Sequence, residues 1–171
     1  MCILHFKAPL RQGQNLTKSS ARKACHQDAC LPGRLHLSQK TKPRLQTVRM
    51  PSTLREIAAG AFAYDTSLDN LVIPNGVESI GEDAFAHCTA LQTLTLGKGL
   101  KHVAAGAFRD CAQLAKAVFA AGLESVGAEA FAGCWRMQSV SLPLSVTNVA
   151  ESAFDECVSL TGGTVPTSRA P

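Results

Sequence analysis

Phenylalanine recurs at a constant interval through most of this chain of 171 residues. Five phenylalanines lie 23 residues apart, at Phe62, Phe85, Phe108, Phe131 and Phe154. Each follows an alanine, and a cysteine or, in the first copy, an aspartate comes three residues later. Chance does not hold several such columns in register over four intervals. The chain is therefore built from stacked copies of one structural unit.

The first half of each unit predicts a short strand that is stopped by a turn. In the unit that begins at Leu68, the run Leu71, Val72 and Ile73 is typical of a strand. Pro74, Asn75 and Gly76 then end it, because proline cannot donate a ladder hydrogen bond and Asn-Gly favours a turn.

The second half leaves two interpretations open. Its apolar residues recur at helical spacing over residues 80–91, which is compatible with a purely helical repeat. A unit of 23 residues is too short for two helices, however, so one strand and one short helix or 3₁₀ turn fit better.

A unit of this size cannot bury its apolar face alone, but a stack of units can. We therefore expect an α/β repeat solenoid of the leucine-rich-repeat kind. Short parallel strands would lie side by side on the concave face, about 4.8 Å apart. Short helices or 3₁₀ turns would line the convex face.

The repeated pattern L-x-x-L-x-L-P-x-x-V-x-x-I-G-x-x-A-F-x-x-C resembles the BspA-like leucine-rich repeats, also called the treponemal type. The resemblance covers residues 45 to about 166, and the best matching units read LVIPNGVESIGEDAFAHCTAL and VSLPLSVTNVAESAFDECVSL. It implies a bacterial or protozoan surface protein that binds host matrix proteins or other cells.

Charge divides the chain into unequal parts. Residues 1–47 carry nine Lys or Arg and one acid, whereas residues 48–171 carry eight basic and twelve acidic residues. We expect a basic, poorly ordered head at 1–44, about five repeat units at 45–166, and a tail at 167–171. A translation start nearer to Met50 is the alternative for the head. Its basic residues are not interleaved with aromatic ones, so specific nucleic-acid binding is not expected.

The cysteines raise the question of a metal site. Cys88, Cys111, Cys134 and Cys157 lie one per unit, which places them in a ladder, whereas zinc ligands must converge on one point. We therefore expect a buried structural column with neither metal nor disulfide. In the head, the run from Cys25 to His36 holds four potential ligands, but its spacing matches no common zinc signature.

No catalytic motif stands out, since the chain has neither a G-x-S-x-G sequence nor a glycine-rich phosphate loop. We therefore expect a protein-binding scaffold that is not an enzyme and needs no cofactor. The candidate binding residues are those that alternate with the buried residues of each concave strand. They are Thr47, Arg49, Asn70, Val72, Thr93, Thr95, Lys116, Val118, Ser139 and Ser141.

This face has one Arg and no aromatic residue, so it lacks the usual anchors of a tight protein interface. Trp135 interrupts the repeat pattern directly after Cys134. If exposed, this residue would be an interaction anchor, and if buried, it would fill the turn.

The ends of the chain bear on location and assembly. The apolar stretch at residues 1–6 is too short for a secretory signal, and no apolar run is long enough to span a membrane. The sequence therefore favours the cytoplasm, whereas the resemblance favours a surface or secreted location. No polar cap follows the last unit, so self-association through an open solenoid end is the alternative function.

Overall fold

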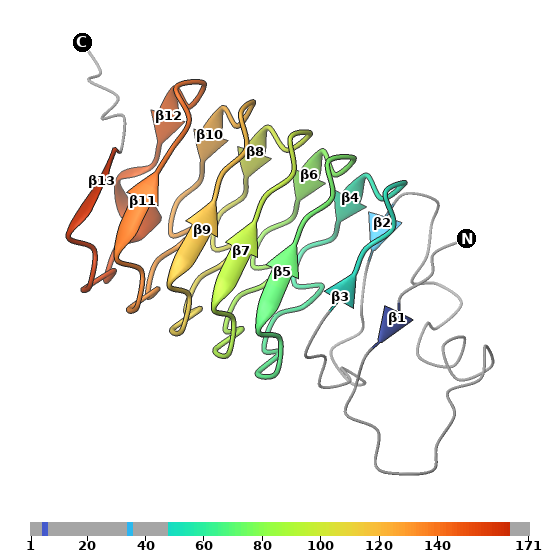
Figure 1. Cartoon of the computed structure of the whole chain (residues 1–171), viewed down its shortest axis with the longest axis horizontal. Coiled ribbons are helices and arrows are strands. Elements are labelled where there is room, and N and C mark those ends of the chain that lie inside the picture. The colour runs from blue at the N-terminus through green and yellow to red at the C-terminus, as the bar shows by residue number, and fades with distance from the viewer. Residues whose placement is uncertain (1–4, 7–33, 36–47, 165–171) are drawn as a thin grey trace.

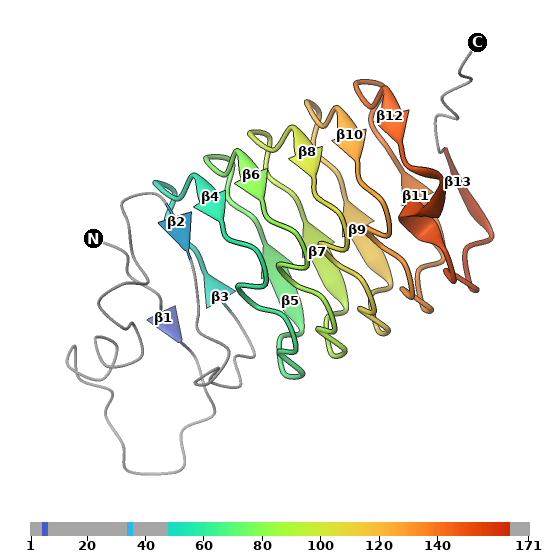
Figure 2. The same cartoon turned by 180° about the vertical axis from the view of Figure 1, so that it is seen from behind.

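The computed structural model describes residues 5–6, 34–35 and 48–164 (Figure 1). Over 48–164 the chain forms a solenoid in which each 23-residue repeat is one rung, and two rows of parallel strands run along its length. The front row consists of β3 (Val48–Arg49), β5 (Asn70–Val72), β7 (Thr93–Thr95), β9 (Lys116–Val118), β11 (Ser139–Ser141) and β13 (Gly162–Thr164). The back row, seen from behind in Figure 2, consists of β2 (Arg34–Leu35), β4 (Glu56–Ile57), β6 (Ser79–Ile80), β8 (His102–Val103), β10 (Ser125–Val126) and β12 (Asn148–Val149).

The strand register advances by one repeat at each step of the front row. Leu71 of β5 lies opposite Leu94 of β7, which lies opposite Ala117 of β9. β3 lies beside β5, and β9 lies beside β11, which pairs with β13 (Figure 1). The expected solenoid of parallel strands with a 23-residue spacing is thus confirmed, and the front row corresponds to the face that the sequence analysis describes as concave.

The back of each rung consists of tight 3₁₀-type turns with little regular helix, which agrees with the expected short helix or 3₁₀ turn. Within the described residues, the 3₁₀ helix η2 (Glu151–Phe154) is the single helix. The other rungs form a two-residue strand followed by tight turns with left-handed residues, such as Asp83 (φ 51°) and His87 (φ 59°). The backbone there bonds between rungs: the N–H groups of Phe85 and His87 donate to Ala107 and Arg109, both at 2.8 Å. They alternate with 3₁₀-type bonds within the rung, such as those from Ala86 N–H to the Asp83 oxygen at 3.0 Å and from Cys88 N–H to the Phe85 oxygen at 3.3 Å.

Two short segments of the head pair with the first rung. β1 (His5–Phe6) runs antiparallel to β3, and β2 runs parallel to β4 in the back row. The remaining head residues lie outside the described part of the chain, and they include the potential ligands between Cys25 and His36. The tail at 167–171 also lies outside it.

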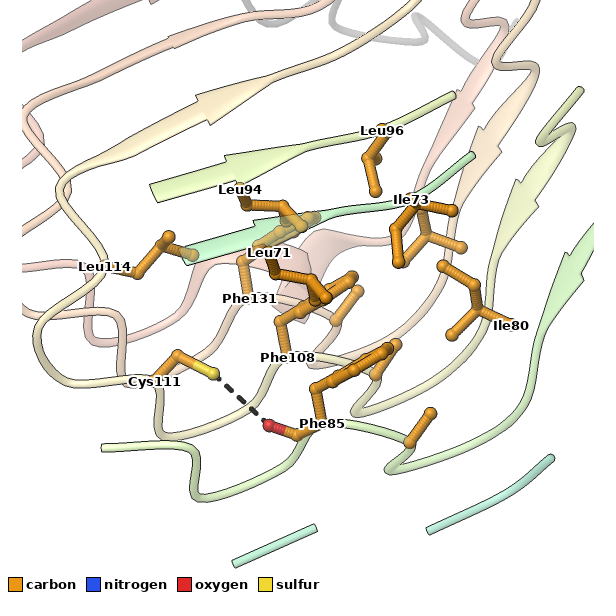
Figure 3. Close-up of a cluster of buried hydrophobic side chains, with 14 of the residues drawn as sticks. Leu71, Ile73, Ile80, Phe85, Leu94, Leu96, Phe108, Cys111, Leu114 and Phe131 are labelled. Atoms are coloured by element: carbon orange, nitrogen blue, oxygen red, sulfur yellow. Dashed lines mark hydrogen bonds between the residues drawn. The ribbon is translucent and has the colours of Figure 1, made fainter. Parts of the chain in front are cut away.

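The core consists of equivalent apolar side chains stacked from rung to rung (Figure 3). The rings of Phe62, Phe85 and Phe108 are nearly parallel, with successive centroids 5.0 and 5.2 Å apart. The stack continues through Phe131 to Phe154 at 5.3 and 5.4 Å. Stacking buries the three inner rings between neighbours on both sides, and this burial is a source of stability that a single unit lacks.

The cysteine column is buried, as expected. Each thiol donates to the carbonyl of the phenylalanine 26 residues earlier, so that Cys111 Sγ lies 3.3 Å from the Phe85 oxygen (Figure 3). The same bond occurs at 3.2 Å from Cys88 to Phe62 and from Cys157 to Phe131. Burial raises the pKa of the Cys111 thiol well above its ordinary value. These thiols are therefore structural donors and poor nucleophiles.

Glycine at position 97 allows neighbouring rungs to approach closely. A Cβ atom there would lie 2.3 Å from the Pro74 carbonyl oxygen, whereas a Cβ at Gly162 would meet nothing within 4 Å. We expect Gly97→Ala to lower the free energy of unfolding by about 1–3 kcal/mol, because the rigid backbone must shift. Urea unfolding followed by circular dichroism measures this loss. Gly162→Ala is the matched control, and equal effects of the two substitutions would contradict the close approach.

The raised pKa of Cys111 makes stability depend on alkaline pH. Above its ordinary pKa the thiol ionises in the unfolded chain but stays protonated in the folded one. The stability that the buried thiol contributes is therefore fully present below the ordinary pKa. It is lost as the pH rises from there toward the raised pKa of the folded state. The expected loss is about 1.4 kcal/mol per pH unit for each such thiol. Urea unfolding at several pH values above about 9 should show a shallower decline in Cys111→Ala than in the wild type. An unchanged slope would show that Cys111 ionises equally in both states.

Candidate protein-binding surfaces

The front face is a regular array of exposed side chains. In the front strands β5, β7 and β11 the middle residue is buried, as Leu71 and Leu94 are, while its neighbours are exposed. In β9 the middle residue, Ala117, is half-buried. Two columns result. Asn70, Thr93, Lys116 and Ser139 form one, and Val72, Thr95, Val118 and Ser141 form the other.

Eight of the ten candidate binding residues thus share one exposed face. Thr47 lies outside the described residues, and for Arg49 the structure describes only the backbone in β3. Within the array Thr93 donates its hydroxyl hydrogen to the side-chain oxygen of Asn70. Val72 and Val118 are 60% and 43% exposed, one on each side of Thr95. The described part of this face carries one charge, that of Lys116, and suits broad contact with a weakly charged partner surface.

Turns at one edge of the solenoid present a second exposed column. In each rung the residue three positions after a cysteine donates its N–H to that cysteine's carbonyl, as Met137 does to Cys134 at 3.1 Å. The two residues between them therefore lie at the tip of the turn. Trp135 occupies a tip and is 52% exposed, which excludes the interpretation that it fills the turn.

In the residues that come before these turn tips in the sequence, polar and aromatic side chains pair with those of the neighbouring rungs. Tyr64 stacks on His87 with ring centroids 4.5 Å apart, and His87 Nδ1 lies 3.4 Å from Asp110 Oδ2. The Arg109 guanidinium lies 2.8 Å from Glu129 and 3.0 Å from Asp83. The hydrogen bond to Glu129 raises the pKa of Arg109, with the charge of Asp83 adding to this.

These pairs were not predicted from the sequence, although the sequence contains one signal of them. Tyr64, His87 and Asp110 lie 23 residues apart, so they must share a column. Their contact depends on a left-handed backbone, with φ values of 65°, 59° and 57°. The spacing of residues in the sequence does not predict this conformation.

In the described ranges no three His, Cys, Asp or Glu side chains are grouped to hold a metal ion. No helix in the same part of the chain has the length and apolar character needed to cross a membrane.

Comparison with known proteins connects this architecture to a family. The model of the BspA type leucine rich repeat region matches residues 39–167 in six copies. No curated protein matches the chain.

Several solved bacterial structures share the fold. The leucine-rich repeat protein of T. pallidum superposes with a TM-score of 0.65 at 30% identity, covering 79% of this chain and 59% of that one. A leucine-rich cell surface protein from Faecalibacterium prausnitzii gives 0.65 at 31% identity, over 70% of this chain and 31% of that one. A leucine-rich repeat protein from Bacteroides ovatus gives 0.65 at 25% identity, over 83% and 38%.

The chain thus spans less than two thirds of the length of each of these proteins. The family model, in contrast, covers most of the chain. The chain belongs to the BspA-type leucine-rich repeat family.

Proposed function

We propose that the chain binds a protein partner through its front face. The observation that carries this proposal is the continuous exposed array on β5, β7, β9 and β11, which runs over four rungs without interruption. Leucine-rich-repeat solenoids generally serve as protein-interaction scaffolds and are typically not catalytic. Their extended faces suit large, shallow protein contacts better than small ligands.

The proposed partner class is a host matrix or cell-surface protein, so that the chain acts in adhesion. Two points support this class. The family resemblance implies it, and the similar protein from Faecalibacterium prausnitzii is described as a cell surface protein. The weakly charged front face suits such a partner better than a nucleic acid, which requires several Lys or Arg for its phosphates.

Substitution on the front face tests the proposed site. Thr95→Glu places a charge between Val72 and Val118, and we expect it to weaken binding at least ten-fold, because the carboxylate would lose its water on contact. Surface plasmon resonance against a panel of purified host matrix proteins measures the change. Thr147→Glu on the back of the solenoid is the control and should bind as the wild type does. Equal binding by both variants would place the contact elsewhere.

Location tests the adhesion proposal independently of the site. Antibody against the chain should label intact source cells if the protein acts at the surface. Labelling that requires permeabilised cells would contradict adhesion and direct the search to intracellular partners, while leaving the front-face proposal to the binding measurements.

Self-association is the second candidate function. In the last described rung Val149, Phe154 and Leu160 are only partly buried, whereas the equivalent Val126, Phe131 and Met137 are at most 1% exposed. This partly exposed core favours contact with a second copy. Sedimentation velocity over a wide range of protein concentration should then show oligomers that grow with concentration. A monomer throughout would exclude this candidate.

A further inference from the structure

The turn tips that follow each cysteine differ sharply from rung to rung. The tip pairs are Thr89-Ala90, Ala112-Gln113, Trp135-Arg136 and Val158-Ser159. Three of the four pairs are small or neutral, whereas the third combines tryptophan with arginine, the two residue types most enriched at interface hot spots together with tyrosine.

Trp135 and Val158 form an exposed apolar pair. They occupy the same tip position of neighbouring rungs and are 52% and 79% exposed. Stacked rungs are separated by roughly 4.8 Å, so the two side chains lie within reach of one apolar group of a partner. Neither side chain belongs to the core, in which Cys134 and Met137 already fill the inner side of the turn.

The charge of Arg136 is not balanced by a carboxylate. Arg55 pairs with Glu78, and Arg109 pairs with Asp83 and Glu129. Of the arginines whose side chains the structure describes, Arg136 is the one without an acidic partner. Its Nη1 instead donates to the neutral Gln113 Oε1 at 2.7 Å, one rung back.

We propose that Trp135, Arg136 and Val158 form a second binding site, which takes a protein segment with an apolar side chain next to a single carboxylate. The apolar group would cover Trp135 and Val158, and the carboxylate would pair with Arg136. A positioned guanidinium binds a carboxylate through two parallel hydrogen bonds, and this adds direction to the apolar contact. The site rests on the proposed role as a protein-binding scaffold but is separate from the front face.

A single carboxylate fits better than a densely charged strand. Residues 137–168 contain three acids, Glu151, Asp155 and Glu156, and no Lys or Arg. The rung beyond Arg136 is therefore acidic, and it would repel a polyphosphate backbone or a run of acids. This charge distribution disfavours a nucleic acid as the occupant.

The chain carries its own reporter, because Trp135 is its single tryptophan. Random twelve-residue peptides displayed on phage would be selected against the full chain, and the selected peptides would be titrated while Trp135 emission is followed. We expect sequences that join an apolar residue to one Asp or Glu, and a blue shift of the emission as the ring is covered.

Variants at the tip then test the assignment of each residue. Arg136→Glu should weaken the selected peptides about ten-fold or more, and Arg136→Lys less, because lysine keeps the charge but loses the two-point contact. Trp135→Ala, measured by an immobilised-peptide assay, should also weaken them. All three residues are exposed at a turn tip, so circular dichroism and the unfolding midpoint should stay unchanged.

The outcomes separate this proposal from the front-face one. Peptides that bind wild type and Thr95→Glu equally but fail on Arg136→Glu support the tip site, whatever the fate of the front face. The proposal is overturned if no selected peptide shifts Trp135 emission, if basic peptides are selected, or if binding survives Arg136→Glu. Competition by a single-stranded oligonucleotide in preference to the peptides would overturn it in favour of a nucleic acid.

Discussion

The stacking of each side chain on its equivalent in the next rung determines the rest of this structure. The phenylalanine rings repeat at 5.0–5.4 Å and are within 10° of parallel, which requires neighbouring rungs to keep one spacing and one register. The cysteine hydrogen bonds depend on that register, because each thiol reaches a carbonyl of the previous rung. The columns also depart from the pattern in places: Ala117 is smaller than its neighbours Leu94 and Val140, and Phe119 contacts Phe131 edge-on with ring centroids 5.5 Å apart.

The same register turns every exposed position into a column, so the molecule presents its surface chemistry in rows. Charges that meet in a column are paired in most cases, as in Lys101 with Glu124 and Arg55 with Glu78. Each exposed pair adds little stability, since water screens it and ordering two long side chains costs entropy. Pairing has another consequence: the paired charges neutralise each other, so the exposed side chains that remain unpaired are the ones available to contact a partner.

The sequence predicted the parts of the structure that repetition enforces. The Phe and Cys columns, the buried middle residue of β5, β7 and β11 and the exposed array around Thr95 all follow from residues 23 apart. Two-residue strands such as β6 are too short to leave an alternating pattern, so the back row could not be predicted. The left-handed backbone at Asp83 and His87 was hidden for a different reason: neither is glycine, and the conformation is held by bonds to the next rung. The exposure of Trp135 depended on the turn at Cys134, which only the structure defines.

The two proposed sites reflect the different freedom of strands and turns. On the front face Val72, Thr93, Thr95 and Val118 are β-branched, as suits side chains that pack beside equivalents on adjacent strands. A large or charged residue there would meet a neighbour about 4.8 Å away on either side. A turn tip projects beyond the ladder and tolerates a tryptophan and an arginine without disturbing the rungs. We therefore infer that the front strands supply contact area for a partner and that the turn tips supply binding specificity. A single repeat can then acquire an anchor residue at its tip while the buried column of that repeat stays unchanged.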